Sequence, residues 1–257
     1  MILLKNGREI SFLREANRIV TEVLKIVVNH IQPGITTREL DRIAEKEIRK
    51  RGARPAFKGY RGYPFTTCIS VNEVVVHGIP GGRKIKEGDL VSIDLGAKWK
   101  GYYGDAALTY PVGKISTRAK KLLQVTYTAL WEGIRKAKAG NRLGDISFAI
   151  QNKVEREGFQ VVKAFVGHGI GRELHEDPQV PNFGEPGKGV KLREGMTLAI
   201  EPMVNEGTEE VIILEDGWTA VTRDGKLSAH FEHTVVIKKE GPEILTLGWE
   251  DLLPPFF

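Results

Sequence analysis

The sequence holds a single cysteine, Cys68, and no long uninterrupted apolar run. One cysteine cannot form an internal disulfide, which agrees with a reducing compartment. No stretch approaches the roughly 18 apolar residues of a membrane-spanning helix. The opening segment MILLKNGREI also becomes charged too early for the apolar core of a signal peptide. Low-complexity segments and an obvious interdomain linker are absent too. We therefore expect a cytoplasmic protein without a membrane segment.

What is present is enough for a large core, since the chain has 257 residues and 41% hydrophobic content. The net charge of +5 permits contact with a polyanion. Many basic residues, however, fall on two helical stretches, residues 38–54 and 118–138, where they alternate with apolar positions. A solvated amphipathic face is the favoured interpretation, and contact with the ribosome through this basic surface is the alternative.

Helical patterns appear twice in the same order. Apolar spacing predicts a helix over residues 9–31, and Thr36 with Glu39 forms a capping box that starts a second helix ending at Gly52. Later, a helix over residues 119–139 is followed by one that ends at Gly158. The segment KEGDLVSID (Lys86 to Asp94) returns as REGMTLAIE (Arg193 to Glu201), 107 positions on.

This repeat predicts two similar halves, roughly residues 1–113 and 114–257, related by a pseudo-twofold axis within a single catalytic domain spanning 1–257. Each half reads as helix, helix and then β-hairpins, which is an α+β pattern with an antiparallel sheet covered by helices.

Two aspartates face each other on the predicted hairpin of residues 91–111. If residues 98–101 form a four-residue loop, Asp94 lies directly opposite Asp105. Directly opposed residues have Cβ atoms about 4.5 to 5.5 Å apart, and like charges so close are destabilising. A shared proton or a divalent cation must therefore neutralise them. The repeat places Glu201 where Asp94 lies and places Glu232 on the strand that matches Asp105. Four converging carboxylates favour two divalent metal ions over a shared proton.

Histidines complete the pattern. The stretch FVGHGIGRELHEDPQV is too rich in glycine for a stable helix, so a loop or irregular strand is expected there. His168 in it is a candidate metal ligand, and His175 is left free to stabilise a transition state. Strand alternation places His230 on the face of Glu232, beside the ligands, and directs His233 to the other face.

The segments NEVVVHGIP, ID followed by GDAA, GHGIGRELHEDPQV, IEPMV and SAHFEHT resemble those of the type I methionine aminopeptidases over nearly the whole chain. The resemblance implies the pita-bread fold and a dinuclear metal centre with Asp94, Asp105, His168, Glu201 and Glu232 as ligands. It implies removal of the initiator methionine from nascent peptide N-termini when the next residue is small.

The chemistry expected of these residues is hydrolysis. Two divalent ions, cobalt, manganese or iron, would lower the pKa of a bridging water and present hydroxide to the first peptide bond. Glu201 would carry a proton toward the leaving amine, and His175 would donate a hydrogen bond to the developing oxyanion. By resemblance, His77 would contact the substrate amide.

An apolar pocket for the thioether side chain is also implied by the resemblance. Its expected lining is Tyr60, Tyr63, Cys68 and Trp218, with Phe57 and Leu174 at two positions that depart from the bacterial pattern. Ordinary core packing is the alternative for the aromatic residues.

Two other functions share these features. A proline-cleaving relative, a prolidase or aminopeptidase P, would keep the five ligands but usually carries an extra amino-terminal domain, whereas the expected helices begin here within about ten residues of the start. A non-enzymatic binding module would have lost metal ligands. The five candidate ligands favour an enzyme, and we expect it to be a monomer.

Overall fold

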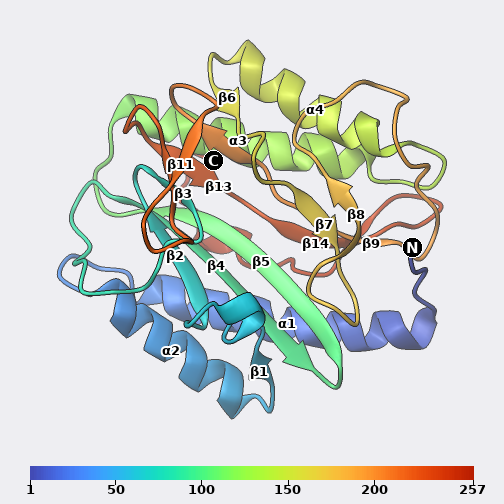
Figure 1. Cartoon of the computed structure of the whole chain (residues 1–257), viewed down its shortest axis with the longest axis horizontal. Helices are drawn as coiled ribbons and strands as arrows, with labels where there is room; N and C mark the ends of the chain where they lie inside the picture. The colour runs from blue at the N-terminus through green and yellow to red at the C-terminus, as the bar shows by residue number, and fades with distance from the viewer.

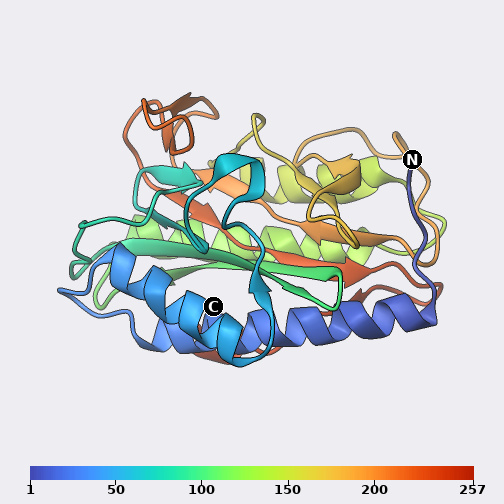
Figure 2. The same ribbon diagram turned by 60° about the horizontal axis from the view of Figure 1, so that its bottom comes forward.

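A computed structural model describes residues 1–257. Two pairs of helices lie on either side of layered strands, with α1 and α2 below and α3 and α4 above in Figure 1; the turned view of Figure 2 shows the same layering. The helices are α1 (Gly7–Asn29), α2 (Thr37–Lys50), α3 (Thr117–Lys136) and α4 (Leu143–Arg156), with short 3-10 turns η1 (Tyr60–Gly62) and η2 (Glu250–Leu252).

The helices begin where capping residues stand. In α2 the Thr36 hydroxyl accepts the Glu39 N–H at 3.2 Å, and the Glu39 carboxylate accepts the Thr36 N–H at 2.8 Å, which confirms the predicted capping box. Asn6 and Glu9 form the same box at the start of α1, two residues before the predicted start of that helix. The four helices thus confirm the predicted order, with ends displaced by two or three residues.

The strands of the first half are β1 (Arg54–Pro55), β2 (Thr67–Val71), β3 (Val74–Val76), β4 (Leu90–Trp99) and β5 (Tyr102–Pro111). Those of the second half are β6 (Gln160–Val161), β7 (Gly167–Gly169), β8 (Glu176–Val180), β9 (Thr197–Ile200), β10 (Met203–Asn205), β11 (Val211–Ile213), β12 (Ala220–Thr222), β13 (Ser228–His230), β14 (His233–Val236) and β15 (Glu243–Ile244). The order of two helices followed by hairpins therefore occurs twice, as the repeat predicted.

Every strand pair is antiparallel. One sheet pairs β4 with β5 on one edge and with β1 and β2 on the other, and a five-stranded sheet runs β15-β14-β9-β7-β8. Two smaller sheets run β13-β10-β6 and β11-β12-β3. A bridge between Ala107 and Glu232 links strand β5 of the first half to the second half.

The register of the β4–β5 hairpin corrects the prediction. Asp94 lies opposite Ala107, and Asp105 lies opposite Gly96, so the two aspartates are not directly opposed. The turn has two residues, Lys100 and Gly101, whose φ angles of 45° and 87° are those of a tight hairpin turn. Each strand is therefore longer than the prediction allowed, because residues 98 and 99 pair within the hairpin and do not belong to a four-residue loop. Because the register differs by two residues, both aspartates still project from the same face.

One large core joins the two halves. Val20 of α1, Ile93 of β4, Leu130 of α3 and Ile200 of β9 belong to a single cluster of 47 buried apolar residues. No helix combines the length and the apolar character that crossing a bilayer requires.

Candidate active site

A cavity of about 280 Å³ is lined by every residue that the sequence singled out for a site. The acidic and imidazole side chains around it are His77, Asp94, Asp105, His168, His175, Glu201 and Glu232. The residues expected to line a substrate pocket are there as well: Phe57, Tyr60, Tyr63, Cys68, Leu174 and Trp218. The two halves thus contribute to one cavity.

The four carboxylates reach the cavity from different elements. Asp94 and Asp105 project from β4 and β5, and Glu201 follows directly after β9. Glu232 lies in the break between β13 and β14, not within a strand as expected, and its N–H donates to the Ala107 carbonyl at 2.8 Å. That bond fixes Glu232 against β5 and so places it beside Asp105.

His168 projects from β7 into this group. Its Nδ1 lies 2.9 Å from the Gly169 carbonyl oxygen, which can only accept, so Nδ1 carries the hydrogen. The Nε2 lone pair is left facing Glu201 Oε1 at 3.6 Å and Asp105 Oδ2 at 3.9 Å. Asp105, His168 and Glu232 each offer a ligand atom, and these three atoms lie within 4.8 Å of one another.

Burial makes the ionised carboxylates costly. It raises the pKa of Asp94 and of Glu201 to about 7. Burial, reinforced by neighbouring carboxylates, holds the pKa of Asp105 and of Glu232 well above the ordinary range. Without a counter-charge these groups retain protons near neutral pH, and a cation among them would reverse that.

The glycines of the GHGIG stretch are required for close packing. A Cβ at Gly167 would lie 2.4 Å from the Ala199 carbonyl oxygen of β9, and one at Gly169 would lie 2.2 Å from the Asp177 carbonyl oxygen. The segment is a short strand and a loop, as the sequence predicted.

His175 lies at the end of this loop with its ring in the cavity wall. Its Nδ1 lies 2.8 Å from the Tyr60 hydroxyl, and its ring centroid is 4.3 Å from that of His168. His175 keeps an exposed edge, but the groups around its ring restrict hydration, and this desolvation, with smaller contributions from His168 and Arg61, lowers the pKa of His175 to about 3. The ring is therefore neutral at neutral pH.

His77 also lines the cavity, directly after β3. Its φ of 58° is a left-handed conformation that few residues other than glycine adopt, and strain of this kind concentrates at functional sites. Its ring meets that of Phe165 edge-on at 5.2 Å. Burial lowers the pKa of His77 to about 4, so this ring is also neutral.

The apolar wall is held by aromatic contacts. The ring of Tyr63 meets that of Trp218 edge-on at 5.1 Å, and the Tyr63 hydroxyl donates toward the Thr67 and Gly78 carbonyls at 2.9 and 3.2 Å. Cys68 pairs with Asp94 across β2 and β4, which puts its thiol at the junction of the apolar wall and the carboxylates.

The chain matches metallopeptidase family M24 over residues 11–239. This chain belongs to that family. Methionine aminopeptidase 1 of Bacillus subtilis is 56% identical to it over 246 residues, which cover 96% of this chain and 99% of that protein. The resemblance to methionine aminopeptidases is confirmed, and the chain is a hydrolase of this group.

Solved structures agree with the assignment to M24. Methionine aminopeptidase from Thermotoga maritima superimposes with a TM-score of 0.94 at 53% identity, covering 96% of this chain and 99% of that chain. The prolidase from Pyrococcus horikoshii has a TM-score of 0.78 at 27% identity and is covered to 64% of its length. The expected pita-bread fold is thereby confirmed.

The donor atoms of this M24 site fit divalent metal. Oδ1 of Asp94, Oδ1 of Asp105 and Oε1 of Glu232 are buried and have no hydrogen-bond partner in the protein. Buried polar atoms are normally satisfied, and carboxylate oxygens with one imidazole are donors that manganese, iron and related ions accept.

Two further histidines take the places that strand alternation predicted. His230 lies beside the carboxylates, with Nε2 at 3.4 Å from Glu201 Oε2. His233 points into the core, where it stacks on Trp249 at 4.6 Å.

Six residues that line the cavity were not predicted: Arg61, Val76, Ala164, Phe165, Val166 and Met203. Arg61 and Val76 adjoin predicted residues in the chain, and the other four lie within four positions of His168 or Glu201, so nearness in the chain was the available signal. Apart from the exposed Arg61, their side chains are of types common in any core, so the sequence alone could not separate them from ordinary packing.

Proposed function

We propose that this M24 enzyme removes an amino-terminal methionine from nascent polypeptides when the second residue is small. The observation that carries the proposal is the junction of two surfaces in one cavity. Buried carboxylates with His168 form one side, and an apolar wall that includes Tyr63 and Trp218 forms the other. A peptide whose first side chain enters the apolar part would present its first peptide bond to the carboxylates.

Asp94, Asp105, His168, Glu201 and Glu232 would hold two divalent metal ions, with cobalt, manganese and iron as candidates. Bound there, the ions would supply Lewis-acid activation of the attacking water. Glu201 would take up the proton released in the attack and deliver it to the leaving amine, because its carboxylate lies in the cavity wall among the other ligands.

His175 would stabilise the oxyanion that develops on the substrate carbonyl. A neutral imidazole has one donor nitrogen, and the Tyr60 hydroxyl lies 2.8 Å from Nδ1. If that hydroxyl donates to Nδ1, the ring hydrogen is on Nε2, and the Nε2–H can donate a hydrogen bond to the substrate oxygen. His77, which lines the same cavity, would contact the amide of the bond to be cleaved.

The methionine side chain would enter the part of the cavity lined by Phe57, Tyr60, Tyr63, Cys68, Leu174 and Trp218. A cavity of about 280 Å³ is at the lower end of ligand-site sizes, which favours a single side chain. The His168 to His175 loop and His77 flank the cleft, so the second residue of the substrate has little space.

The decisive test compares peptides that differ only at the second residue. Met-Ala-Ser should release methionine at least roughly tenfold faster than Met-Leu-Ser at equal concentration, because a clash of a few buried atoms costs about 1 to 3 kcal/mol. Acetyl-Met-Ala-Ser and a Xaa-Pro dipeptide serve as controls and should not be cleaved. Comparable release from the alanine and leucine peptides would remove the support for small-residue selectivity, and preferred cleavage of the Xaa-Pro dipeptide would indicate a prolidase.

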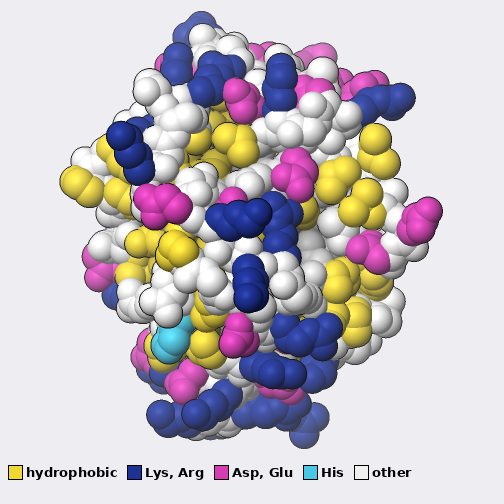
Figure 3. Space-filling model, turned by 90° about the vertical axis from the view of Figure 1, so that its left-hand side faces the viewer, with side chains coloured by type: hydrophobic (Ala, Val, Ile, Leu, Met, Phe, Trp, Pro, Cys, Tyr) yellow, Lys and Arg dark blue, Asp and Glu magenta, His cyan; other side chains and the backbone are white.

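We also propose ribosome contact through the basic surface. Arg38, Arg42 and Lys46 of α2 are exposed, and Arg83 and Lys84 are exposed on the loop that bridges to Thr36 just before α2. Figure 3 shows Lys and Arg side chains gathered at the lower end of the face that it presents, and α2 lies at the lower end of the molecule in Figure 1.

We propose further that the enzyme is cytoplasmic and monomeric and forms one catalytic domain over 1–257. The single buried cysteine and the continuous core support this proposal.

A further inference from the structure

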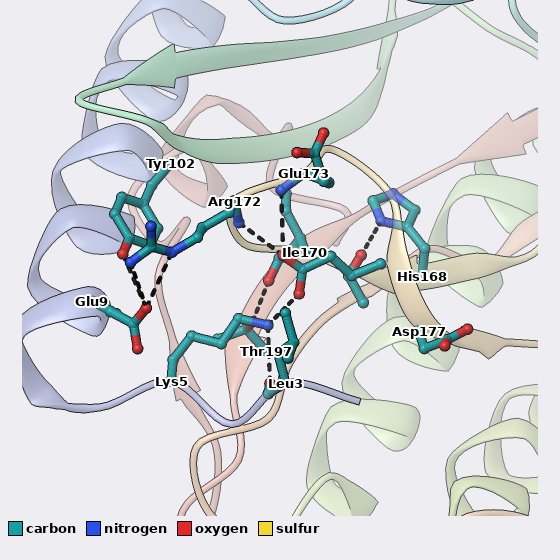
Figure 4. Close-up of polar contacts among 12 residues, drawn as sticks. Leu3, Lys5, Glu9, Tyr102, His168, Ile170, Arg172, Glu173, Asp177 and Thr197 are labelled. Atoms are coloured by element: carbon teal, nitrogen blue, oxygen red, sulfur yellow. Dashed lines mark hydrogen bonds and ion pairs between the residues drawn. The ribbon is translucent and has the colours of Figure 1, made fainter. Parts of the chain in front are cut away.

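The loop that carries His175 is fastened from outside the cavity by the segment before α1. Lys5 Nζ forms an ion pair with the Glu176 carboxylate, and the two side chains are only 5% and 8% exposed. Glu176 directly follows His175 in the chain, whereas Lys5 is 171 positions away and does not line the cavity. Figure 4 shows the Lys5 side chain reaching up from the amino-terminal segment to the strands and loop that follow His168.

A glycine of the GHGIG stretch makes room for this pair. A Cβ at Gly171 would lie 2.5 Å from Cε of Lys5 and 2.5 Å from Oε1 of Glu176. The φ of Gly171 does not lie in the left-handed region, so backbone conformation does not demand glycine there. A side chain at this position would instead have to displace the ends of Lys5 and Glu176 from their paired positions.

The second oxygen of Glu176 closes the loop on itself. Glu176 Oε1 accepts the backbone N–H of Arg172 at 2.8 Å and that of Glu173 at 3.3 Å. On the outer side, the Arg172 guanidinium donates to Glu9 Oε1 of α1 at 3.2 Å, and this oxygen also accepts the Tyr102 hydroxyl at 3.0 Å (Figure 4). The loop is thus tied to the chain's first helix and to the tip of the β4–β5 hairpin.

A buried ion pair is a poor source of stability, because two charges must lose their hydration. Its charges do impose one arrangement on the groups around them. Here the arranged groups include the backbone next to His175, and the His175 ring is held separately by the contact between its Nδ1 and the Tyr60 hydroxyl. We infer that Lys5 and Glu176 are positioning residues for His175, holding its ring where the oxyanion develops. This inference rests on the role proposed for His175.

The test compares Lys5→Met with Lys25→Met in the full-length protein saturated with manganese. Lys25 Nζ pairs with Asp251 Oδ2 at 3.0 Å on the surface, so Lys25→Met also removes the lysine of an ion pair, but far from the loop. Lys5→Met should lower kcat for Met-Ala-Ser roughly tenfold with KM and metal content unchanged, because small displacements of a catalytic group have large effects on rate. Lys25→Met should keep the wild-type kcat.

A second readout does not depend on activity. The ¹³Cε1–¹H NMR signal of His175, assigned by its loss in His175→Ala, should shift in Lys5→Met and stay in place in Lys25→Met. Glu176→Gln keeps an acceptor for both loop amides, and its effect on kcat should be non-additive with that of Lys5→Met in the double variant. If Lys5→Met does not fold, Glu176→Gln carries both measurements.

The outcomes separate this inference from the proposed function. A lower thermal midpoint with unchanged kcat and unchanged His175 signal would overturn the positioning role and leave a purely structural ion pair. A loss of bound metal in parallel with kcat would overturn it as well. If His175→Ala itself keeps full activity, the proposed role of His175 falls, whatever Lys5→Met does to the signal.

Discussion

At the scale of single residues, the three histidines of the site differ in the contacts that their ring nitrogens make. His168 has its Nδ1 hydrogen bound to a carbonyl, so Nε2 can act as a ligand. Desolvation lowers the pKa of His175 to about 3 and that of His77 to about 4, so both stay neutral through the physiological range. A neutral ring can donate one hydrogen bond without adding positive charge beside metal ions.

His175→Ala should lower kcat by roughly two orders of magnitude or more, as the loss of one oxyanion donor does. Metal content should stay at the wild-type level, since the side chain removed is not an expected ligand. The measurement is steady-state hydrolysis of Met-Ala-Ser together with elemental analysis of the purified variant. His30→Ala is the matched control, because that ring is exposed at the end of α1 and bonds only to the Ile26 carbonyl at 2.7 Å. If His175→Ala loses metal and activity together, the two histidines of the loop have been assigned in the wrong order.

At the scale of elements, α1 packs directly on the β4–β5 hairpin, which carries two of the carboxylates. A Cβ at Gly104 would lie 2.7 Å from the backbone nitrogen of Asn17 in α1. This close approach lets the Asn17 side-chain oxygen accept the Asp105 N–H at 3.2 Å, while the Asn17 amide donates to the Leu13 carbonyl at 2.9 Å. The helix therefore fixes the strand at the residue that carries the carboxylate.

Gly104→Ala should destabilise the protein by about 1 to 3 kcal/mol, because the added methyl meets helix backbone that cannot move away. Chemical denaturation of the metal-free protein measures the free energy of unfolding. Gly82→Ala is the control: Gly82 is exposed, its φ is not left-handed, and no atom lies within 4 Å of an added Cβ. That change should stay within roughly 0.5 kcal/mol. Equal effects of the two substitutions would mean that α1 is not held against β5.

At the scale of the whole molecule, the buried carboxylates link stability to pH and to metal. Their pKa values in the unfolded chain lie near 4, whereas in the folded chain the pKa of Asp94 and of Glu201 is about 7. A raised folded pKa gives a contribution that is present below the unfolded pKa and is lost as pH rises through the folded pKa. The metal-free protein should therefore lose stability as the pH rises from about 4 through 7.

Thermal unfolding of the EDTA-treated protein should show a lower midpoint at about pH 8 than at about pH 6. Added manganese should raise the midpoint more at the higher pH, because binding needs ionised ligands and stabilises only the folded chain. Asp94→Asn removes one of the titrating groups and should weaken the pH dependence of the metal-free form. A midpoint that does not change with pH in the metal-free wild type would contradict the burial of these carboxylates.

Much of this arrangement was set by local sequence. The four helices follow from apolar spacing and from caps such as Thr36 with Glu39, because a cap and a helix face depend on residues a few positions apart. The common face of Asp94 and Asp105 follows from the two-residue period of a strand, which a register shift of two leaves unchanged. The repeat, the motifs and the family resemblance together selected thirteen residues that line one cavity.

Only the tertiary structure decided what depends on contacts between distant segments. The hairpin register depended on whether Lys100 could take a left-handed conformation before Gly101, a choice made jointly by the turn and by the strands on either side. The pairing of Lys5 with Glu176 beside Gly171 leaves no periodic signal in the sequence. Lys5 is 171 positions from Glu176 and 166 from Gly171, so all three look like ordinary surface residues in the sequence. Local preferences act over one or two turns of chain, whereas the position of His175 is set by packing that brings the amino-terminal segment against the second half.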